Sequence, residues 1–295
     1  MAHELLHGYA LATLESARAS GELERVAGEV EAFAAALTSS EPLRRALSDA
    51  AVAQNARRAI AADLLHGRAS EAGASLVDFA LRAVRAGELA VAVADLVVAA
   101  DAAREGVAEQ PIHGRSALRS RIRGYTERVL EELGSLDEVD TVEEQLFSFA
   151  RIVEANAELR RELSEPSAAV AGRVALLADL LSSQVLPATL RIVSFVIAVG
   201  PVRNLVGTYE WLVDLIAEER GRRVAQVRAA VVLSEEERSS LARVLSTLVH
   251  RDVEVRMIED PDVIGGILVS VGDLLIDGTV RLRLERLREA VAQWA

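Results

Sequence analysis

The sequence predicts a mainly α protein: two tandem six-helix bundles followed by a small α/β C-terminal domain. Three observations predict this class. Ala, Leu, Val, Glu and Arg dominate the composition and aromatic residues make up only 3%, which is typical of helical proteins. The chain repeats itself at an offset of 116 residues, and β-branched apolar runs appear after Arg220. We expect domains at residues 1–107, 116–221 and 222–295.

The repeat aligns without a gap. Gly8-Tyr9 falls on Gly124-Tyr125, and Phe33-Ala34 falls on Phe149-Ala150. Further matches are Leu14-Glu15 on Leu130-Glu131, Leu43-Arg44-Arg45 on Leu159-Arg160-Arg161, Leu47-Ser48 on Leu163-Ser164, Arg57 on Arg173, Asp63-Leu64-Leu65 on Asp179-Leu180-Leu181, and Phe79 on Phe195. Solenoid repeats have periods of roughly 20 to 50 residues, so the offset indicates a duplicated domain. We call residues 1–107 the first copy and 116–221 the second copy.

Each copy is expected to contain six helices. In the first copy the periodic segments are Tyr9–Ala19, Leu23–Leu37, Pro42–Ser48, Ala53–Leu65, Ser75–Ala86 and Leu89–Arg104. The stripe Leu23, Val26, Val30, Phe33 and Leu37 predicts one buried helical face. Six such helices can enclose one core. The shared leucines are expected in that core, whereas the shared Arg and Asp positions are expected to pair at the surface.

The C-terminal domain is expected to begin with a strand, a helix and a second strand. Val224–Leu233 is a β-branched apolar run of strand length. Ser234 followed by Glu237 has the spacing of a capping box, which starts a helix. Asp252–Ile258 alternates apolar and charged residues, as a half-buried strand does.

A hairpin and a last helix are expected to complete this domain. Apolar residues dominate Val263–Val271, Gly272-Asp273 breaks the run, and Leu274–Ile276 resumes it. Asp277-Gly278 ends the second strand, and Thr279 stands where it can cap a helix. From there apolar residues form the stripe of an amphipathic helix: Val280, Leu282, Leu284, Leu287 and Val291.

A search for catalytic groups favours structural explanations. Gly265-Gly266 lies inside an apolar run without the GK[ST] ending of a phosphate loop, so we interpret it as a bulge or a close contact. Asp273 and Asp277 each neighbour a Gly at a strand end, which favours turns over acid–base catalysis. His3 and His7 are four apart at a terminus that is expected to fray, so we expect no metal site there. We expect no cofactor.

Composition also limits partners and location. A net charge of −12 argues against nucleic acid, which is bound by dense Lys and Arg. The chain contains no Cys, which fits a reducing compartment. The N-terminus lacks the features of a signal peptide, and the apolar stretches are shorter than the roughly 20 residues that span a bilayer. Contact with a membrane is therefore expected only through partners.

The order of elements in Asp260–Glu289 resembles the C-terminal signature of the delta subunit of the rotary ATP synthase, called OSCP in mitochondria. Its parts are a Gly-Gly strand, a Gly-Asp turn, a strand ending in Ile-Asp-Gly-Thr-Val, and an Arg-Leu-Glu-Arg-Leu helix. The first copy is similar to the N-terminal bundle of these subunits in Tyr9-Ala10, Leu14, Gly21, Leu23, Val26, Glu29 and Phe33. Two bundles are a departure from most members and resemble the enlarged actinobacterial forms.

The resemblance implies a non-catalytic connector in the peripheral stalk at the cytoplasmic face of the membrane. An N-terminal bundle would hold the N-terminal helix of an alpha subunit, the C-terminal domain would hold the end of subunit b, and other head subunits would lie nearby. We favour the first copy for alpha, although the second adjoins the C-terminal domain as the single bundle of shorter relatives does. The residues expected to meet partners are Tyr9, Leu14, Val26, Leu274, Ile276, Leu284 and Leu287.

Two other functional classes remain open on the sequence. A cytoplasmic adaptor or regulatory protein of duplicated helical bundles, unrelated to ATP synthase, would show the same helical periodicity. An acid–base enzyme using Asp273 and Asp277 is the third class. Recovery of alpha, beta and b subunits by affinity purification would separate the first class from the others.

Overall fold

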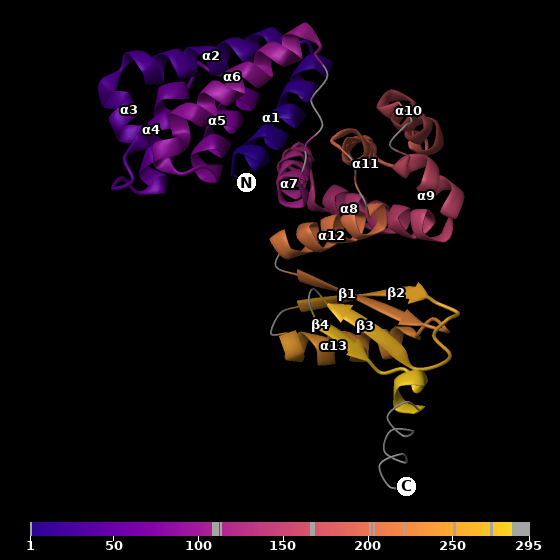
Figure 1. The fold of residues 1–295 in the computed structure, drawn as a ribbon. Coiled ribbons are helices and arrows are strands. Elements are labelled where there is room, and N and C mark those ends of the chain that lie inside the picture. Colours follow the sequence, from indigo (N-terminus) through magenta and orange to yellow (C-terminus); the bar gives the residue numbers. More distant parts are fainter. Residues whose placement is uncertain are drawn as a thin grey trace. The chain divides into compact units, whose positions relative to one another are not determined.

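The structure is a computed structural model, and it is mainly helical with a four-stranded sheet near the C-terminus (Figure 1). It describes residues 2–107, 112, 114–165, 169–200, 202, 204–220, 222–249, 252–271 and 274–284. In this part of the chain no helix is both long enough and apolar enough to cross a membrane. The chain divides into two compact units: residues 1–145 with 152–205, and residues 146–151 with 206–295.

The first copy forms the six predicted helices. They are α1 (Ala2–Ala19), α2 (Leu23–Ser39), α3 (Glu41–Ser48), α4 (Gln54–Leu65), α5 (Glu71–Ala83) and α6 (Leu89–Glu105), with a 3-10 turn at Ala86–Glu88. One buried cluster joins α1 to α6 through Tyr9, Phe33, Leu47, Phe79 and Leu96. On the sequence alone the N-terminus is expected to fray, but the structure places a helix there. Helix α1 already begins at Ala2, and the Nδ1 atom of His3 lies 3.0 Å from the Asp95 carboxylate on α6.

The second copy repeats the same elements. They are α7 (Arg115–Glu131), α8 (Leu136–Ala155), α9 (Ala157–Ser164), α10 (Val170–Leu181), α11 (Pro187–Ala198) and α12 (Leu205–Glu219). Shifted by 116 residues, α3 and α4 coincide with α9 and α10 at both ends. The register predicted from identities is therefore confirmed at the level of elements.

Residues shared by the two copies test the predictions of a common core and of surface ion pairs. Leu47 and Leu163 are both fully buried, as expected of shared core residues. The shared arginines divide: Arg44 and Arg45 pair at the surface with Glu41, as expected, whereas Arg57 and Arg173 do not. Arg57 donates to the Leu47 carbonyl at 3.4 Å, and Arg173 donates to the Leu163 carbonyl at 2.9 Å. Each guanidinium thereby gives a hydrogen-bond donor to a carbonyl in the last turn of the preceding helix, where carbonyls lack partners within the helix.

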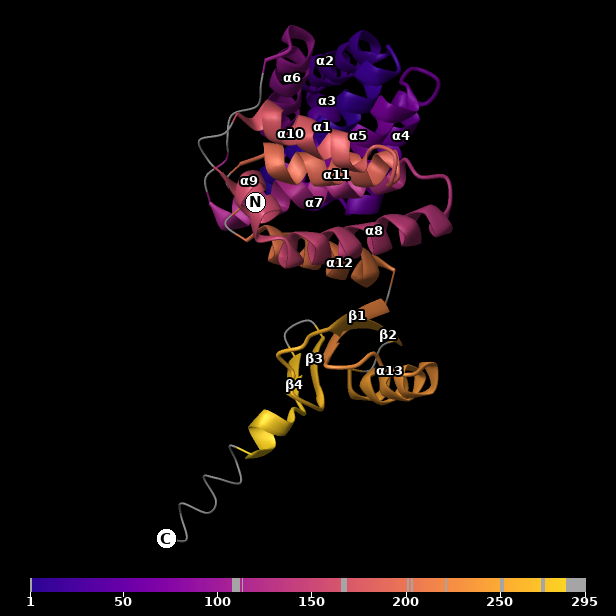
Figure 2. The same ribbon diagram turned by 90° about the vertical axis from the view of Figure 1, so that its right-hand side faces the viewer.

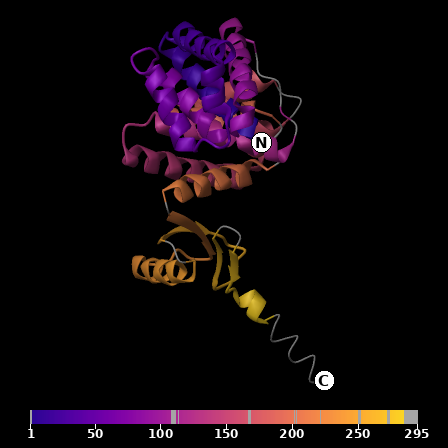
Figure 3. The same cartoon turned by 90° about the vertical axis from the view of Figure 1, so that its left-hand side faces the viewer.

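The sheet has strand order β2-β1-β3-β4. Its members are β1 (Arg222–Ala229), β2 (Asp252–Glu259), β3 (Ile267–Val271) and β4 (Leu274–Asp277); β1 pairs parallel with β2, and the other pairs are antiparallel. Helix α13 (Glu235–Val249) covers one face, where Leu245 packs among the valines of the sheet (Figures 2 and 3). The predicted capping box is present: Ser234 Oγ accepts from the Glu237 N–H at 3.3 Å, and the Glu237 carboxylate accepts from the Ser234 N–H at 2.8 Å.

Two strands are shorter than predicted. β1 ends at Ala229, because its partners β2 and β3 end opposite that residue, and Val231 and Val232 are exposed. β3 begins only at Ile267. Gly266 has a φ of +79°, and a Cβ there would overlap the Gly278 carbonyl oxygen, so the expected close contact at the Gly-Gly pair is present. The Gly272-Asp273 turn lies outside the described residues.

The last predicted helix begins as expected. Thr279 Oγ1 accepts from the Leu282 N–H at 3.3 Å, and the Asp277 carboxylate accepts from the Thr279 N–H at 2.9 Å. Asp277 therefore forms a turn, which is the explanation that the sequence favoured. Helical backbone is described for residues 280–284, and the rest of the expected helix lies outside the described residues.

Candidate functional site

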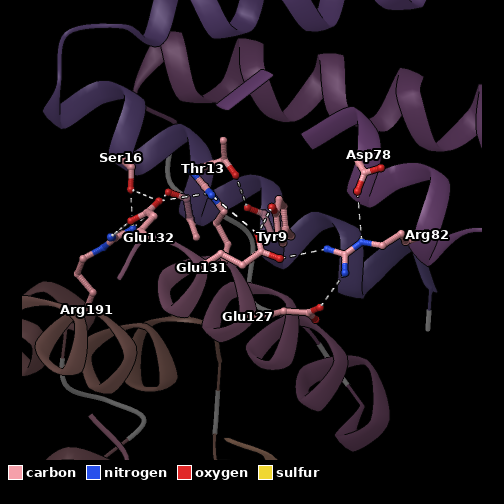
Figure 4. A network of polar contacts seen from close by, with 11 residues as sticks. Tyr9, Thr13, Ser16, Asp78, Arg82, Glu127, Glu131, Glu132 and Arg191 are labelled. Atoms are coloured by element: carbon pink, nitrogen blue, oxygen red, sulfur yellow. Dashed lines mark hydrogen bonds and ion pairs between the residues drawn. The ribbon is translucent and has the colours of Figure 1, made fainter. Parts of the chain in front are cut away.

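The helix pair α1–α7 joins the two copies, and it is the most distinctive site in the first unit (Figure 4). Early residues contact early residues and late residues contact late ones: Glu4 bonds Arg121 at 2.7 Å, and Ser16 donates to Glu132 at 2.7 Å. The two helices therefore run in the same direction. Because glycine lacks a Cβ, the backbones can approach closely at Gly8 and Gly124. A Cβ on Gly8 would overlap the Arg121 carbonyl oxygen, and one on Gly124 would overlap that of Leu5.

Two buried tyrosines connect each copy to the other. The Tyr9 hydroxyl donates to the Glu131 carboxylate of α7, and the Tyr125 hydroxyl donates to the Glu15 carboxylate of α1. Burial raises the pKa of Tyr9, and the hydrogen bond and charge of Glu131 raise it further. Burial likewise raises the pKa of Tyr125, assisted by the charge of Glu15. Both hydroxyls therefore remain protonated donors at neutral pH.

Ion pairs extend both ends of this network. On the first copy, Arg82 lies 3.1 Å from Glu131 and 3.6 Å from Asp78, and Asp78 accepts two hydrogen bonds from Arg58, at 2.6 and 2.9 Å. On the second copy, Arg191 of α11 donates to Glu132 at 2.6 Å and to Ser16 Oγ at 2.9 Å. These charges are paired within the chain, so the arrangement holds helices together and does not present an acid–base dyad.

Of the grooves along the helix pair, one lies beside each tyrosine. The groove at Tyr9, of about 620 Å³, is lined mainly by α4 and α5 and carries Arg58, Asp78, Arg82 and Glu131. The groove at Tyr125, of about 350 Å³, is lined mainly by apolar side chains of α1, α6, α7 and α11, among them Leu11, Leu14, Ala99, Phe195, Ala198 and Val199.

One residue explains much of the difference between the grooves. Tyr9 stacks on Phe79 with ring centroids 3.8 Å apart, and Tyr125 stacks on Phe195 at 3.7 Å, so the aromatic pair is repeated. Arg82 lies over the Phe79 ring, 4.9 Å from its centroid. The equivalent residue in the second copy is Ala198, which is too short to cover Phe195. Phe79 is buried, whereas Phe195 is partly exposed.

The N-terminal residues predicted to meet a partner are engaged inside the chain. Tyr9, Leu14 and Val26 are each at most 2% exposed. Tyr9 borders the charged groove and Leu14 the apolar one, while Val26 packs in the core between α2 and α6. The structure thus separates residues that the sequence grouped together. Their contact with a partner stays a prediction.

The C-terminal residues predicted to meet a partner are more accessible. Leu274 and Leu284 are 39% and 60% exposed, and the neighbouring Leu275, which the sequence analysis did not select, is 65% exposed. Ile276 is partly buried against the sheet core, because successive side chains of a strand point to opposite faces. Leu287 lies outside the described residues. The grooves and the Gly8 and Gly124 contact were also missed; only the repetition of Gly-Tyr in both copies signalled them.

No metal centre accompanies this site within the described residues, where no three His, Cys, Asp or Glu side chains are grouped to hold an ion. The second of the predicted acidic pair, Asp277, is in a turn, and Asp273 lies outside the described residues.

Comparison with known proteins identifies the family. The family model described as ATP synthase delta (OSCP) subunit matches residues 6–113 and 124–291, so each copy begins one of the two matched segments. An ATP synthase subunit delta of Parafrankia sp. (strain EAN1pec) is 31% identical over 92% of this chain and 88% of its own length. Those of Nocardioides sp. (strain ATCC BAA-499 / JS614) and Streptomyces griseus subsp. griseus are 36% and 32% identical, over 88% and 92% of this chain and 84% and 91% of their own lengths. The match displaces the alternative of an unrelated adaptor: this chain belongs to the ATP synthase delta (OSCP) subunit family.

Proposed function

We propose that this chain joins the catalytic head of a proton-translocating ATP synthase to its peripheral stalk, with the helical unit on the head and the sheet unit on the stalk. Membership of the family gives it a structural, non-catalytic place in that complex. The observation that carries the proposal is the family match across both copies and the C-terminal domain. As part of the complex it would act at the cytoplasmic face of the membrane, held there by other subunits.

The head contact is assigned to the apolar groove beside Tyr125. A short amphipathic helix, such as the N-terminal helix of an alpha subunit, binds by laying its apolar face into an apolar groove. The partly exposed Phe195 and Leu11 offer such a surface, and the buried Leu14 also borders the groove. Glu15, Arg18 and Arg121 also line this groove, but apolar side chains predominate there. In the groove beside Tyr9 charged side chains are paired with one another, and their desolvation would oppose an apolar face. This assignment draws on both copies, since Leu11 and Leu14 belong to the first and Phe195 to the second.

Exchange of one side chain between the grooves tests this assignment. Ala198→Arg gives the apolar groove the residue of its counterpart, and Arg82→Ala removes that residue from the charged groove. The account expects Ala198→Arg to abolish binding of a peptide copying the alpha N-terminus, measured by fluorescence anisotropy, while Arg82→Ala retains it. Ala175→Arg, on the exposed side of α10, is the matched control. Loss of binding in Arg82→Ala alone would assign the contact to the first copy.

The stalk contact is assigned to the β4 edge and the helical turn that follows it. β4 is an edge of the sheet, and Leu274, Leu275 and Leu284 expose apolar side chains there. A sheet edge that exposes apolar side chains is a surface on which a partner strand or helix can pair and pack. The C-terminal region of subunit b is the proposed partner, and Ile276 supports the strand from within.

Sedimentation of the catalytic head with membranes tests the stalk contact. We expect the double variant Leu275→Glu/Leu284→Glu to leave the head in the supernatant, because two carboxylates would be desolvated in the contact. Val98→Glu, at a residue 68% exposed on α6, is the control and should sediment normally. Normal sedimentation of the double variant would mean that the stalk is bound elsewhere. Failure of the unmodified chain to bring the head to membranes would reject the proposed function itself.

A further inference from the structure

The closest contacts of the α1–α7 pair recur with the roles of the two helices exchanged, the Glu4–Arg121 ion pair excepted. Leu5 and Arg121 are equivalent at the offset of 116, so Gly8 against the Arg121 carbonyl repeats as Gly124 against the Leu5 carbonyl. Tyr9 to Glu131 repeats as Tyr125 to Glu15. Ser16 bonds Glu132, its own equivalent, so this pair stands at the symmetry axis. Such reciprocity is the property of an isologous dimer interface.

We propose that the face of α1 formed by Leu5, Gly8, Tyr9, Glu15 and Ser16 fits a second copy of itself, so that the chain dimerises through α1 when α7 is displaced. All required groups are present in α1. Glu15 would stand where Glu131 stands and accept from the partner's Tyr9. Arg82 would reach Glu15 of the partner as it now reaches Glu131, at 3.1 Å.

Helix α7 is not equally suited to pair with itself. At the symmetry axis, Ser16 would meet Ser16 in an α1–α1 pair, whereas Glu132 would meet Glu132 in an α7–α7 pair. Like charges at such a position are destabilising. Arg128 also replaces Ala12 one turn earlier. The two faces therefore differ: α1 is self-complementary, and α7 accepts α1 only.

In the intact chain the internal pair is favoured over a dimer. It adds the Glu4–Arg121 ion pair at 2.7 Å and the hydrogen bond from Arg191 to Glu132 at 2.6 Å, neither of which an α1–α1 pair can rebuild. The tether between the copies also supplies an effective concentration on the order of millimolar. The duplication thus holds within one chain a contact that separate copies would share.

Glycine variants of the full chain test the proposal. In Gly124→Leu the new side chain overlaps the Leu5 carbonyl and displaces α7, while the α1 face stays intact. We expect this variant to double in mass by light scattering coupled to size exclusion, whereas Gly8→Leu, which damages α1, stays monomeric. Circular dichroism verifies the helix content of both.

Cysteines report the geometry, since the chain has none of its own. In the otherwise unchanged chain, Ser16→Cys/Glu132→Cys should form an internal disulfide when it is oxidised with diamide. The same pair of cysteines should not form this disulfide when Gly124→Leu is added, and its loss would confirm that α7 has been displaced from α1. If the internal disulfide still forms in the Gly124→Leu chain, α7 has not been displaced. Arg121→Glu is then added, because a carboxylate at position 121 would repel Glu4 and separate the two helices. In the displaced chain, Ser16→Cys alone should form a disulfide-linked dimer, and Ala35→Cys on the exposed side of α2 should not.

Two results would overturn the proposal. One is a folded chain with α7 displaced that stays monomeric and does not cross-link through position 16. The other is equal dimerisation of Gly8→Leu, because the contact would then lie outside the α1 face.

Discussion

The two copies have the same six helices in the same register, yet they differ in what those helices pack against. In the first copy all six helices contribute to a core of their own, where α6 lies against α2 and α1. In the second copy, α12 and the middle of α8 belong to the compact unit that contains the sheet. There Phe149 meets Tyr209 edge-on with ring centroids 5.1 Å apart, and Arg256 of β2 lies 5.3 Å from the Phe147 ring. A duplicated sequence therefore repeats elements more faithfully than it repeats packing partners.

Truncation of the equivalent phenylalanines should have the largest effect and should separate the copies. Phe33 and Phe149 are both buried, as predicted from the register. Replacing either with Ala should cost about 3 to 5 kcal/mol of unfolding free energy, because a cavity remains. Phe33→Ala should loosen the first copy, and Phe149→Ala should loosen α12 and the sheet unit, as measured by hydrogen exchange. Phe→Leu at each site is the conservative control, and identical exchange patterns in both Ala variants would contradict the comparison.

Alanine at Gly8 should have a smaller effect, and of opposite sign to alanine at Gly28. A Cβ on Gly8 overlaps the Arg121 carbonyl, whereas a Cβ on Gly28, within α2, meets nothing within 4 Å. Overpacking should cost Gly8→Ala about 1 to 3 kcal/mol. Gly28→Ala should gain about 0.5 to 1 kcal/mol from helix propensity.

The second copy offers the same glycine comparison, with Gly124 tight and Gly172 open. Urea denaturation measures all four alanine variants. Equal effects at tight and open sites would mean that the backbones of α1 and α7 do not approach as described.

Alkaline pH should have the smallest effect and should act on both units. Burial raises the pKa of Tyr9, Tyr125 and Tyr209 above the usual 10.0. Above about pH 10 the unfolded chain releases these protons and the folded chain retains them, so unfolding is favoured as pH rises. The stabilisation is complete below pH 10 and decreases above it. Urea midpoints should therefore fall between about pH 9 and pH 11, and less steeply in Tyr9→Phe/Tyr125→Phe. A slope unchanged by that double variant would exclude the two tyrosines as its source.

Local signals predicted the elements well, because caps and periodicity are encoded within a few residues. The Ser234 box, the Thr279 cap and all six helices of the first copy were predicted from such signals. Packing partners depend on distant residues and were not predicted. Leu64 is partly buried in the first core, whereas its equivalent Leu180 is 50% exposed, contrary to the shared-core expectation. The pairing of α1 with α7 depends on the close approach of Gly8 to the Arg121 carbonyl. These two residues are more than a hundred positions apart, so no local sequence pattern could predict their contact. For the same reason the burial of Tyr9, which was selected as a partner contact, was not predicted.

The central claim is that the two copies repeat their helices but not their packing partners. It is tested most directly by asking whether α12 unfolds with the sheet unit, while its counterpart α6 does not. Leu245 is 2% exposed in the core between α13 and the sheet, and Leu245→Ala should loosen that unit. Hydrogen exchange followed by mass spectrometry should then show faster exchange in β1–β3, in α12 and in the middle of α8, while its counterpart α6 keeps the protection of the unmodified chain. The account would be contradicted if only the sheet exchanged faster in Leu245→Ala, while α12 stayed as protected from exchange as α7 and α11.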